Sequence, residues 1–185
     1  MAVWRDGETR ASRVEAMARG QAERIAPMAR EIMAEAGLDF AALQRVVVTT
    51  GPGSFTGVRV GLSFARGLAL ALKIPCLGVP SLEALALQHG EEGLRAAIVA
   101  TPGASYAALY QDGAALIAPA PMEAETIQAR LRAASGARDF NLVGPGVAPD
   151  PIALAARGAR LDPASYPPAP LYLRGAGASL PKSPA

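Results

Sequence analysis

Apolar and polar positions follow first a strand-like and then a helical spacing along the opening third of the chain. Two short strands are expected within residues 2–18, on either side of the turn "RDGE", because Asp6-Gly7 is a strong hairpin signal. Apolar residues then recur at helical spacing from Gln21 to Ala36, with Gly37 as the C-cap. The run "RVVVTT" at 45–50 is continuous and β-branched, which predicts a strand covered by helices on both faces.

A glycine-rich turn then leads into a helical pattern at 55–73, which ends before Pro75. A second buried strand at 75–80 and a helix at 81–88, capped by Ser81, are expected next. The second half is richer in strands, and its expected elements are strands at 96–100 and 106–110, a turn at 111–113 into "AALIA", a helix at 124–134 and a strand opening 141–146.

Proline and glycine are dense from Ala148 onward. In that region the pattern predicts only a small apolar island at 170–175 and a disordered tail at 176–185. The order of elements, ββαβαβα and then mostly strands, predicts an α/β fold with two lobes, at 1–92 and 93–175.

The helix expected at 55–73 is apolar around an unusually large part of its circumference. On a wheel of about 100° per residue, Arg59, Arg66 and Lys73 share one narrow stripe with Ser63. Apolar residues cover an arc of roughly 200°, about twice the usual width for a surface helix. Small residues, which let another helix approach closely, recur at every fourth position: Gly57, Gly61, Ala65 and Ala69. The helix is therefore expected either to be buried within the chain, against the helix at 21–36, or to dock on a partner.

Composition excludes several classes of protein. The chain has 185 residues, of which 51% are apolar, and a net charge of +2. This charge is too small, and the arginines too dispersed, to predict a nucleic-acid groove. The single cysteine, Cys76, excludes an internal disulfide, and the single histidine, His89, excludes a metal centre built from paired histidines. No membrane span or signal peptide is expected, so the default is a soluble cytoplasmic protein.

The stretch "GPGSFTG" at 51–57 has the look of a phosphate-binding turn but fits neither specific motif. Gly51 and Gly53 begin a G-x-G-x-x-G pattern that Thr56 breaks, and the chain contains no Gly-Lys pair for a P-loop. Two interpretations stay open. The backbone N–H groups of residues 53–57 can meet an anion at a helix N-terminus, or the glycines only permit a tight turn.

Candidate catalytic residues are scarce. Ser54 lacks the glycine spacing of a G-x-S-x-G nucleophile, which favours a turn or N-cap role. The carboxylates are scattered, with no pair placed for acid–base work. The residues thus argue against an autonomous enzyme, and no catalytic or metal-binding residue is assigned.

The segment "GPGSFTGVRVGLSFARGLALALKIPCLGVPSLEALA" at 51–86 resembles the signature of the TsaB (YeaZ) family. The helix lead-in at roughly 21–50 and "PLYLR" near the end are also similar, whereas 95–169 is not. The resemblance implies an actin-like ATPase (RNase H-like) fold of two lobes. It also implies a role in making threonylcarbamoyladenosine in tRNA, as a non-catalytic scaffold that pairs with the related subunit TsaD, which holds the metal.

The resemblance further implies TsaE as an additional partner, homodimers when the chain is alone, and contact with tRNA only through the complex. ATP or ADP is expected, if anywhere, at the interface with the partner, next to the turn residues Gly51, Gly53, Ser54, Thr56 and Gly57. Pairing is expected to use helices of the first lobe, and the residues assigned to it are Phe55, Val58, Gly61, Leu62, Ala65, Leu68, Ala69, Leu72, Met28 and Ile32.

The sequence departs from this family at its start. Members usually open with a strand of the type "ILAIDTS", central to the first sheet, whereas here Met1 directly precedes "AVWRDGE". The first lobe is therefore expected to be truncated at its N-terminus or its start to be misassigned. The second lobe is short and reads "ATPGASYAALY" where the family often has an Asp-Ala-Arg segment. Two other readings stay open: a glycoprotease-like (peptidase M22-type) hydrolase using Ser54 or a metal, and a non-functional remnant.

Overall fold

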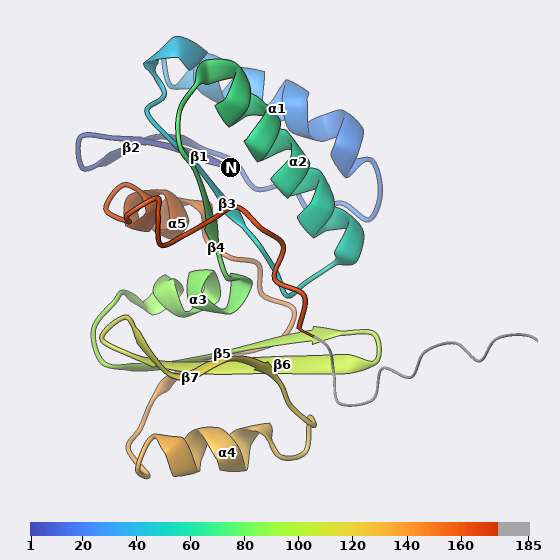
Figure 1. Cartoon of the computed structure of the whole chain (residues 1–185), viewed down its shortest axis with the longest axis vertical. Coiled ribbons are helices and arrows are strands. Elements are labelled where there is room, and N and C mark those ends of the chain that lie inside the picture. Colours follow the sequence, from blue (N-terminus) through green and yellow to red (C-terminus); the bar gives the residue numbers. More distant parts are fainter. Residues whose placement is uncertain (174–185) are drawn as a thin grey trace, which may run out of the picture.

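The computed structural model describes residues 1–173, and within that range the fold is mixed α/β, as expected. Three sheets follow one another along the chain: an antiparallel β1–β2 pair, a parallel β3–β4 pair, and a four-stranded sheet in the order β7-β6-β5-β8. Helices α1 and α2 lie together beside the first two sheets, and α5 lies on their other side (Figure 1). The disordered tail expected at 176–185 lies outside the described residues.

The opening hairpin forms as the sequence predicts. β1 (Ala2–Arg5) and β2 (Glu8–Ser12) are joined by Asp6 and Gly7, which both have positive φ, at 53° and 85°. Two such residues match the right-handed twist of the flanking strands. Val3 and Ala11 are buried against α1 (Gln21–Glu35), whose apolar face carries Ile32 and Met33. A short 3₁₀ turn, η1 (Phe40–Ala42), then leads out of α1 toward the next strand.

A parallel βαβ unit forms the centre of the first half. β3 (Val46–Thr49) and β4 (Cys76–Val79) pair in register from Val46↔Cys76 to Thr49↔Val79, with α2 (Phe55–Leu72) as the crossover. The helix ends at Lys73, whose backbone is left-handed, with φ 56°. α3 (Ser81–Ala86) and the 3₁₀ turn η2 (Leu87–His89) follow, as the pattern at 81–88 predicts. The expected cap is wrong: Ser81 is the first residue of α3, the N-cap position is Pro80, and no side chain caps the helix.

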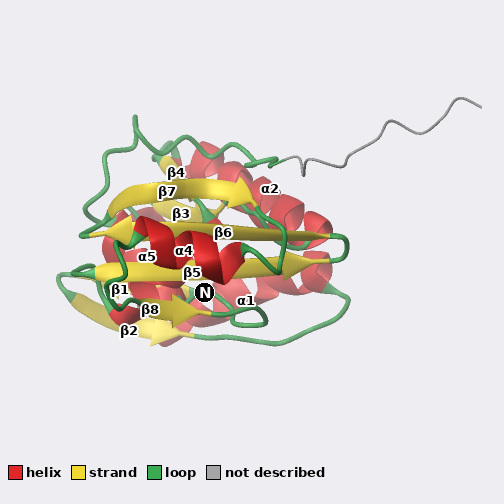
Figure 2. Ribbon diagram, turned by 90° about the horizontal axis from the view of Figure 1, so that it is seen from below, coloured by secondary structure: helices red, strands yellow, loops and turns green. Residues whose placement is uncertain are grey.

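The second half is a three-stranded meander with one added parallel strand. β5 (Leu94–Thr101), β6 (Ala104–Gln111) and β7 (Ala114–Pro121) are longer than the sequence pattern indicated, and β8 (Asn141–Val143) pairs with β5. The buried Leu82 and Leu85 of α3 pack on one face of this sheet. α4 (Ile127–Ala134) covers the other face through Ile127 and Leu131 (Figure 2).

Helix α5 (Pro151–Gly158) was not expected in the proline-rich stretch after Ala148, and this is a correction. Asp150 caps it, accepting a hydrogen bond from the N–H of Ile152 at 2.9 Å, and Pro151 occupies the first turn, where its missing N–H costs nothing. The helix packs against β1, β2 and β3, so residues beyond 150 return to the first half of the chain. The lobe boundary near residue 92 stays a prediction, but these contacts show that 151–173 do not pack only with the second half.

Arg24 of α1 pairs with Glu15, in the segment after β2, and with Glu31 of its own helix. Its guanidinium donates to both Glu15 oxygens at 2.6 and 2.7 Å and to both Glu31 oxygens at the same two distances. Hydrogen bonds from Arg24 lower the pKa of Glu15 and of Glu31 below their ordinary value. Both carboxylates are thus held in the charged form.

We expect Arg24→Gln to lower the free energy of unfolding at pH 7 by a small amount, since the three side chains are partly open to solvent. A carboxylate with a lowered folded-state pKa contributes stability above its unfolded pKa and loses it as the pH falls through the folded value. The loss of stability of the parent chain below about pH 5 is therefore expected to be steeper than that of the variant. Urea unfolding from pH 7 to pH 3 measures this, and parallel curves would contradict it.

Candidate functional site

A cleft of about 820 Å³ opens where the glycine turn meets the second half of the chain. Its walls come from four segments: the turn after β3, the first two turns of α2, the β5–β6 turn and residues 171–173. The lining includes the predicted turn residues Gly51, Gly53 and Ser54. The structure therefore brings together sequence-distant segments around the stretch that first indicated an anion site.

Backbone bonds anchor the glycine turn at both ends. The carbonyl of Thr50, which is buried, accepts a hydrogen bond from the N–H of Leu171 at 2.9 Å. The carbonyl of Gly51 accepts one from the N–H of Ser81 at 2.8 Å. Gly51 has φ 97°, a conformation that suits glycine, and a Cβ there would lie 3.5 Å from the Leu171 carbonyl oxygen. The turn is thus tied to α3 on one side and to residue 171 on the other.

Ser54 caps helix α2, in agreement with the sequence prediction. Its hydroxyl accepts a hydrogen bond from the N–H of Gly57 at 3.3 Å. This bond satisfies one of the free donors with which an anion at the helix N-terminus would otherwise bond. Of the two interpretations left open for the turn, the structural one has this direct support, and anion binding stays a prediction.

We expect Ser54→Ala to lower the free energy of unfolding by about 1 kcal/mol, because it removes an N-cap. Ser63, exposed in the middle of the same helix, provides the matched control. Ser63→Ala is expected to be neutral or to stabilise by up to about 0.5 kcal/mol through helix propensity. Urea unfolding of the two variants measures the difference, and equal stabilities would show that the cap contributes nothing.

The lining of the cleft is poor in groups that bind a magnesium–nucleotide complex. Among the described residues that line the cleft, Arg59 is the one that carries a permanent charge. No Asp or Glu of the described chain lines the cleft to coordinate a cation. Within residues 1–173, no three His, Cys, Asp or Glu side chains are grouped so that they can hold a metal ion. The cleft is large enough for a nucleotide, but these residues alone do not supply the ligands that the metal and phosphates of a nucleotide need.

An aromatic and arginine cluster stands at the mouth of this cleft. The Arg59 guanidinium lies 3.7 Å from the centre of the Phe55 ring, and its Nε donates to the Tyr172 hydroxyl at 3.2 Å. Phe55 and Tyr172 are both 59% exposed, with ring centres 6.3 Å apart. Phe55 was predicted from the sequence to lie in the partner interface, whereas Arg59 and Tyr172 were not predicted to belong to any site. The signal for Tyr172 was the apolar island "PLYLRG", which the pattern alone did not connect to α2.

Half of the predicted interface residues belong to the core of this chain, which corrects the assignment. Met28 and Ile32 of α1 and Leu62, Ala65 and Ala69 of α2 are all at most 8% exposed. The two helices pack against each other, and a Cβ at Gly61 would lie against Val48 of β3, so the buried part of α2 faces this chain rather than another protein. Of the other half, Phe55 is exposed, while four are half-buried: Val58, Gly61, Leu68 and Leu72.

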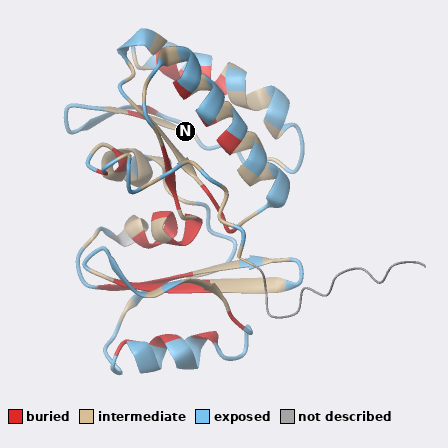
Figure 3. Cartoon of the chain, viewed as in Figure 1, coloured by how far each residue is buried: buried red, intermediate tan, exposed pale blue. Residues whose placement is uncertain are grey.

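The exposed side of α2 carries a stripe of five residues, of which only Phe55 was predicted from the sequence to lie in the partner interface. Its residues follow one another at spacings of three or four, and all are exposed: Phe55, Arg59, Ser63, Arg66 and Leu70. Leu70 is 81% exposed. By length and composition alone, α2 could cross a membrane, although no span was expected from the sequence. Only 17% of its residues are buried inside the chain. Most of the helix is accordingly coloured as exposed or half-buried in Figure 3. This exposed stripe, named from these five residues, is a candidate protein-binding surface.

Two perturbed titratable groups lie outside the cleft. Glu83 accepts a hydrogen bond from the Tyr166 hydroxyl at 3.0 Å and lies 3.7 Å from Arg157. Burial raises the pKa of Glu83, and the hydrogen bond from Tyr166 opposes that effect. Burial also raises the pKa of the Cys76 thiol, which keeps it less reactive. Neither group lines the cleft, so both are assigned to packing.

Comparison with known proteins decides the family. The family model described as "TsaD: tRNA N6-adenosine threonylcarbamoyltransferase" matches residues 14–131, well over half of the chain. The chain belongs to this family. It is 37% identical, over 115 residues, to the tRNA threonylcarbamoyladenosine biosynthesis protein TsaB of Escherichia coli K12, a match covering 60% of this chain and 49% of that protein. It thus spans about half the length of this curated relative.

The solved relatives define the type of family member and the fold. YeaZ from Pseudomonas aeruginosa superposes with a TM-score of 0.69 at 25% identity, covering 93% of this chain and 92% of the other. A second structure, described as an uncharacterized protein with similarity to peptidase YeaZ from P. aeruginosa, gives a TM-score of 0.70 at 26% identity, covering 94% and 93%. The chain is a TsaB/YeaZ-type member with the actin-like (RNase H-like) fold, as the resemblance implied.

Proposed function

We propose that this chain is a non-catalytic subunit in the synthesis of tRNA N6-threonylcarbamoyladenosine and that it pairs with a TsaD homologue. The observation that carries the proposal is the exposed stripe on α2, an apolar helix left largely uncovered in a chain of the TsaD family. A partner that covers this stripe removes apolar surface from water, and pairing between related folds is supported by the family match.

The composition of the exposed stripe supports a protein partner. Aromatic residues and arginine are enriched at the centres of interfaces, and Phe55, Arg59 and Tyr172 form such a cluster at one end of the stripe. Arg59 and Arg66 make the stripe basic, so the complementary surface is expected to carry Asp or Glu. Leu70 supplies an apolar anchor at the other end.

Further members of the assembly follow from the same proposal. We propose that TsaE joins through the TsaD–TsaB pair, that the chain forms a homodimer when alone, and that tRNA contacts this subunit only indirectly. ATP or ADP bound near the glycine turn would need the partner to supply the groups for its metal and phosphates, because the cleft lining of this chain does not supply them.

The hydrolase alternative has less support. The Ser54 hydroxyl is engaged with the N–H of Gly57, and the described residues that line the cleft include no histidine or carboxylate to act as its base. The label "peptidase" in the description of one solved relative is its main support.

Mixing the purified chain with its cognate TsaD homologue tests the proposal. Size exclusion with light scattering is expected to give a one-to-one complex, and calorimetry with TsaD in the cell gives its Kd. Circular dichroism of the chain alone establishes that it is folded. A folded chain that forms no complex would overturn the proposal, and peptide hydrolysis lost in Ser54→Ala would favour the alternative.

A further inference from the structure

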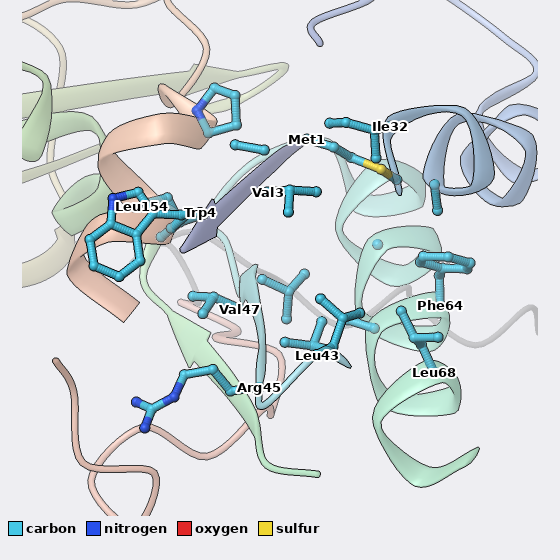
Figure 4. Close-up of a pocket in the computed structure, with 18 of the residues that line it drawn as sticks. Met1, Val3, Trp4, Ile32, Leu43, Arg45, Val47, Phe64, Leu68 and Leu154 are labelled. Atoms are coloured by element: carbon cyan, nitrogen blue, oxygen red, sulfur yellow. The ribbon is translucent and has the colours of Figure 1, made fainter. Parts of the chain in front are cut away.

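Two cavities lie away from the cleft, and their linings differ in polarity. The larger, of about 390 Å³, lies between β1, β3, α2 and α5 and is lined mostly by apolar side chains such as Val47 and Phe64 (Figure 4). Its charged lining residue, Arg45, already donates to the carbonyls of Gly158 and Leu161. Within the described residues, none of its side chains has a buried polar atom without a partner. This cavity therefore does not select a ligand by its chemistry.

The smaller cavity lies where the two halves of the chain meet. Its volume is about 20 Å³, and its lining comes from α3, α5, β5, β6 and the turns next to them. Arg95 of β5 and Tyr110 of β6 are cross-strand partners, so both side chains lie on the face of the sheet that α3 covers. They are only 5% and 6% exposed. We refer to this space as the junction cavity.

Three residues that line the junction cavity have a buried donor without a hydrogen-bond partner. The donors are the Nε of Arg95, the Nε of Arg157 and the hydroxyl of Tyr110. No other buried side-chain nitrogen or oxygen in the described part of the chain lacks a partner. Burial raises the pKa of Tyr110, so its hydroxyl stays protonated. Because buried polar groups are nearly always paired, three such donors around one small space indicate that it binds an acceptor.

The charge around the junction cavity is positive. Glu83 and Glu91 also line it, but both carboxylates are already engaged with arginines. Glu83 lies 3.7 Å from Arg157, and Glu91 accepts hydrogen bonds from Arg157 and Arg160. Arg95 pairs with no carboxylate among the residues that the structure describes. The arginines of this group therefore carry a positive charge that its carboxylates do not balance, which is costly in a buried site.

We propose that the junction cavity binds one halide ion, chloride in ordinary buffers, through Arg95, Tyr110 and Arg157. A volume of about 20 Å³ holds one particle of the size of water, which excludes phosphate, sulfate and carboxylate groups. A water molecule accepts only two hydrogen bonds, whereas a halide accepts all three and also balances the charge of Arg95. Because Arg157 belongs to α5 and the other two residues to the four-stranded sheet, the ion joins the two halves of the chain.

Bromide, a halide with an anomalous signal, tests the position of the ion. Crystals of the full chain grown in sodium bromide are expected to show an anomalous peak within hydrogen-bonding distance of the Arg95 Nε and the Tyr110 hydroxyl. An ordered water at this place, without anomalous signal, would overturn the proposal. A bromide peak combined with no effect of chloride on stability in solution would indicate an adventitious ion only, and would overturn it as well.

Thermal unfolding in two salts tests binding in solution. At equal ionic strength, the melting temperature of the parent chain is expected to be higher in sodium chloride than in sodium gluconate by about 2–4 °C or more, because the ion binds only the folded chain. Arg95→Met, which keeps a long side chain but removes the charge and the donor, is expected to lose this difference. Tyr110→Phe keeps the ring and removes one donor, so it is expected to reduce the difference.

The matched control is Arg130→Met, since Arg130 is an exposed arginine of α4. It is expected to keep the full difference between the two salts, which separates binding at the junction cavity from general effects of salt. A chloride effect of the same size in the parent chain, Arg95→Met and Tyr110→Phe would overturn the proposal. These measurements use this chain alone, so their outcome is independent of pairing with TsaD.

Discussion

Leu70→Asp is expected to weaken binding to the TsaD homologue by at least about 30-fold, which corresponds to a loss of about 2 kcal/mol. Leu70 is the most exposed large apolar residue described, at 81%, and it lies on the exposed stripe of α2. The change removes the apolar anchor and places a carboxylate against the acidic surface expected on the partner, which costs more than the loss of the apolar contact alone. Because the side chain makes little contact in the free chain, folding should be unaffected.

The matched control for this variant is Leu116→Asp. Leu116 of β7 is also exposed, at 47%, but lies on the four-stranded sheet, away from α2. Calorimetry is expected to show unchanged affinity for this control and a large loss for Leu70→Asp. Arg66→Glu adds a second readout, since reversal of a charge on the stripe should slow association most at low salt. Equal affinities of the two aspartate variants would remove α2 from the interface.

Gly158→Ala is expected to lower the free energy of unfolding by about 1–3 kcal/mol. Gly158 ends α5 where this helix meets β3, and a Cβ added there would overlap Val47 Cγ2 and lie 2.9 Å from its Cγ1. The helix cannot withdraw freely, because Arg45 donates to the carbonyls of Gly158 and Leu161 at 2.9 and 3.1 Å. Urea unfolding measures the effect.

A control glycine and a double variant separate this clash from other causes. Gly67→Ala places a methyl group on the exposed side of α2, where no atom lies within 4 Å, so it is expected to stabilise by up to about 1 kcal/mol. Val47→Ala is expected to be destabilising alone but to restore part of the loss when combined with Gly158→Ala, a non-additivity of at least about 0.5 kcal/mol. Strict additivity would show that α5 does not pack on Val47 as described.

The local elements were predictable because their signals are local. Asp6-Gly7 specifies a tight hairpin through backbone conformation alone, and Ser54 at the start of an apolar helical pattern specifies an N-cap. The helix α5 was missed because the apolar signal of eight residues is weak beside so many prolines. Only the capping pair Asp150-Pro151 could have indicated it.

The binding surface was predictable only in part. A helical wheel shows that α2 is apolar around much of its circumference, but it does not say which apolar residues face α1. Ala65 and Ala69 are buried against the chain itself, whereas Leu70, one position further along, is exposed to solvent. The cluster of Phe55, Arg59 and Tyr172 joins residues more than a hundred positions apart, which no periodicity connects.

The sequence by itself determined the α/β class, the order of most elements, the capped glycine turn and the family resemblance that the comparisons confirm. These features depend on residue periodicity, on turn conformation and on one long motif, all of which are read along the chain. The tertiary structure alone decided which side of α2 stays exposed and where residues 151–173 pack. Those features depend on which surfaces distant segments bury against one another, and burial is a property of the folded chain.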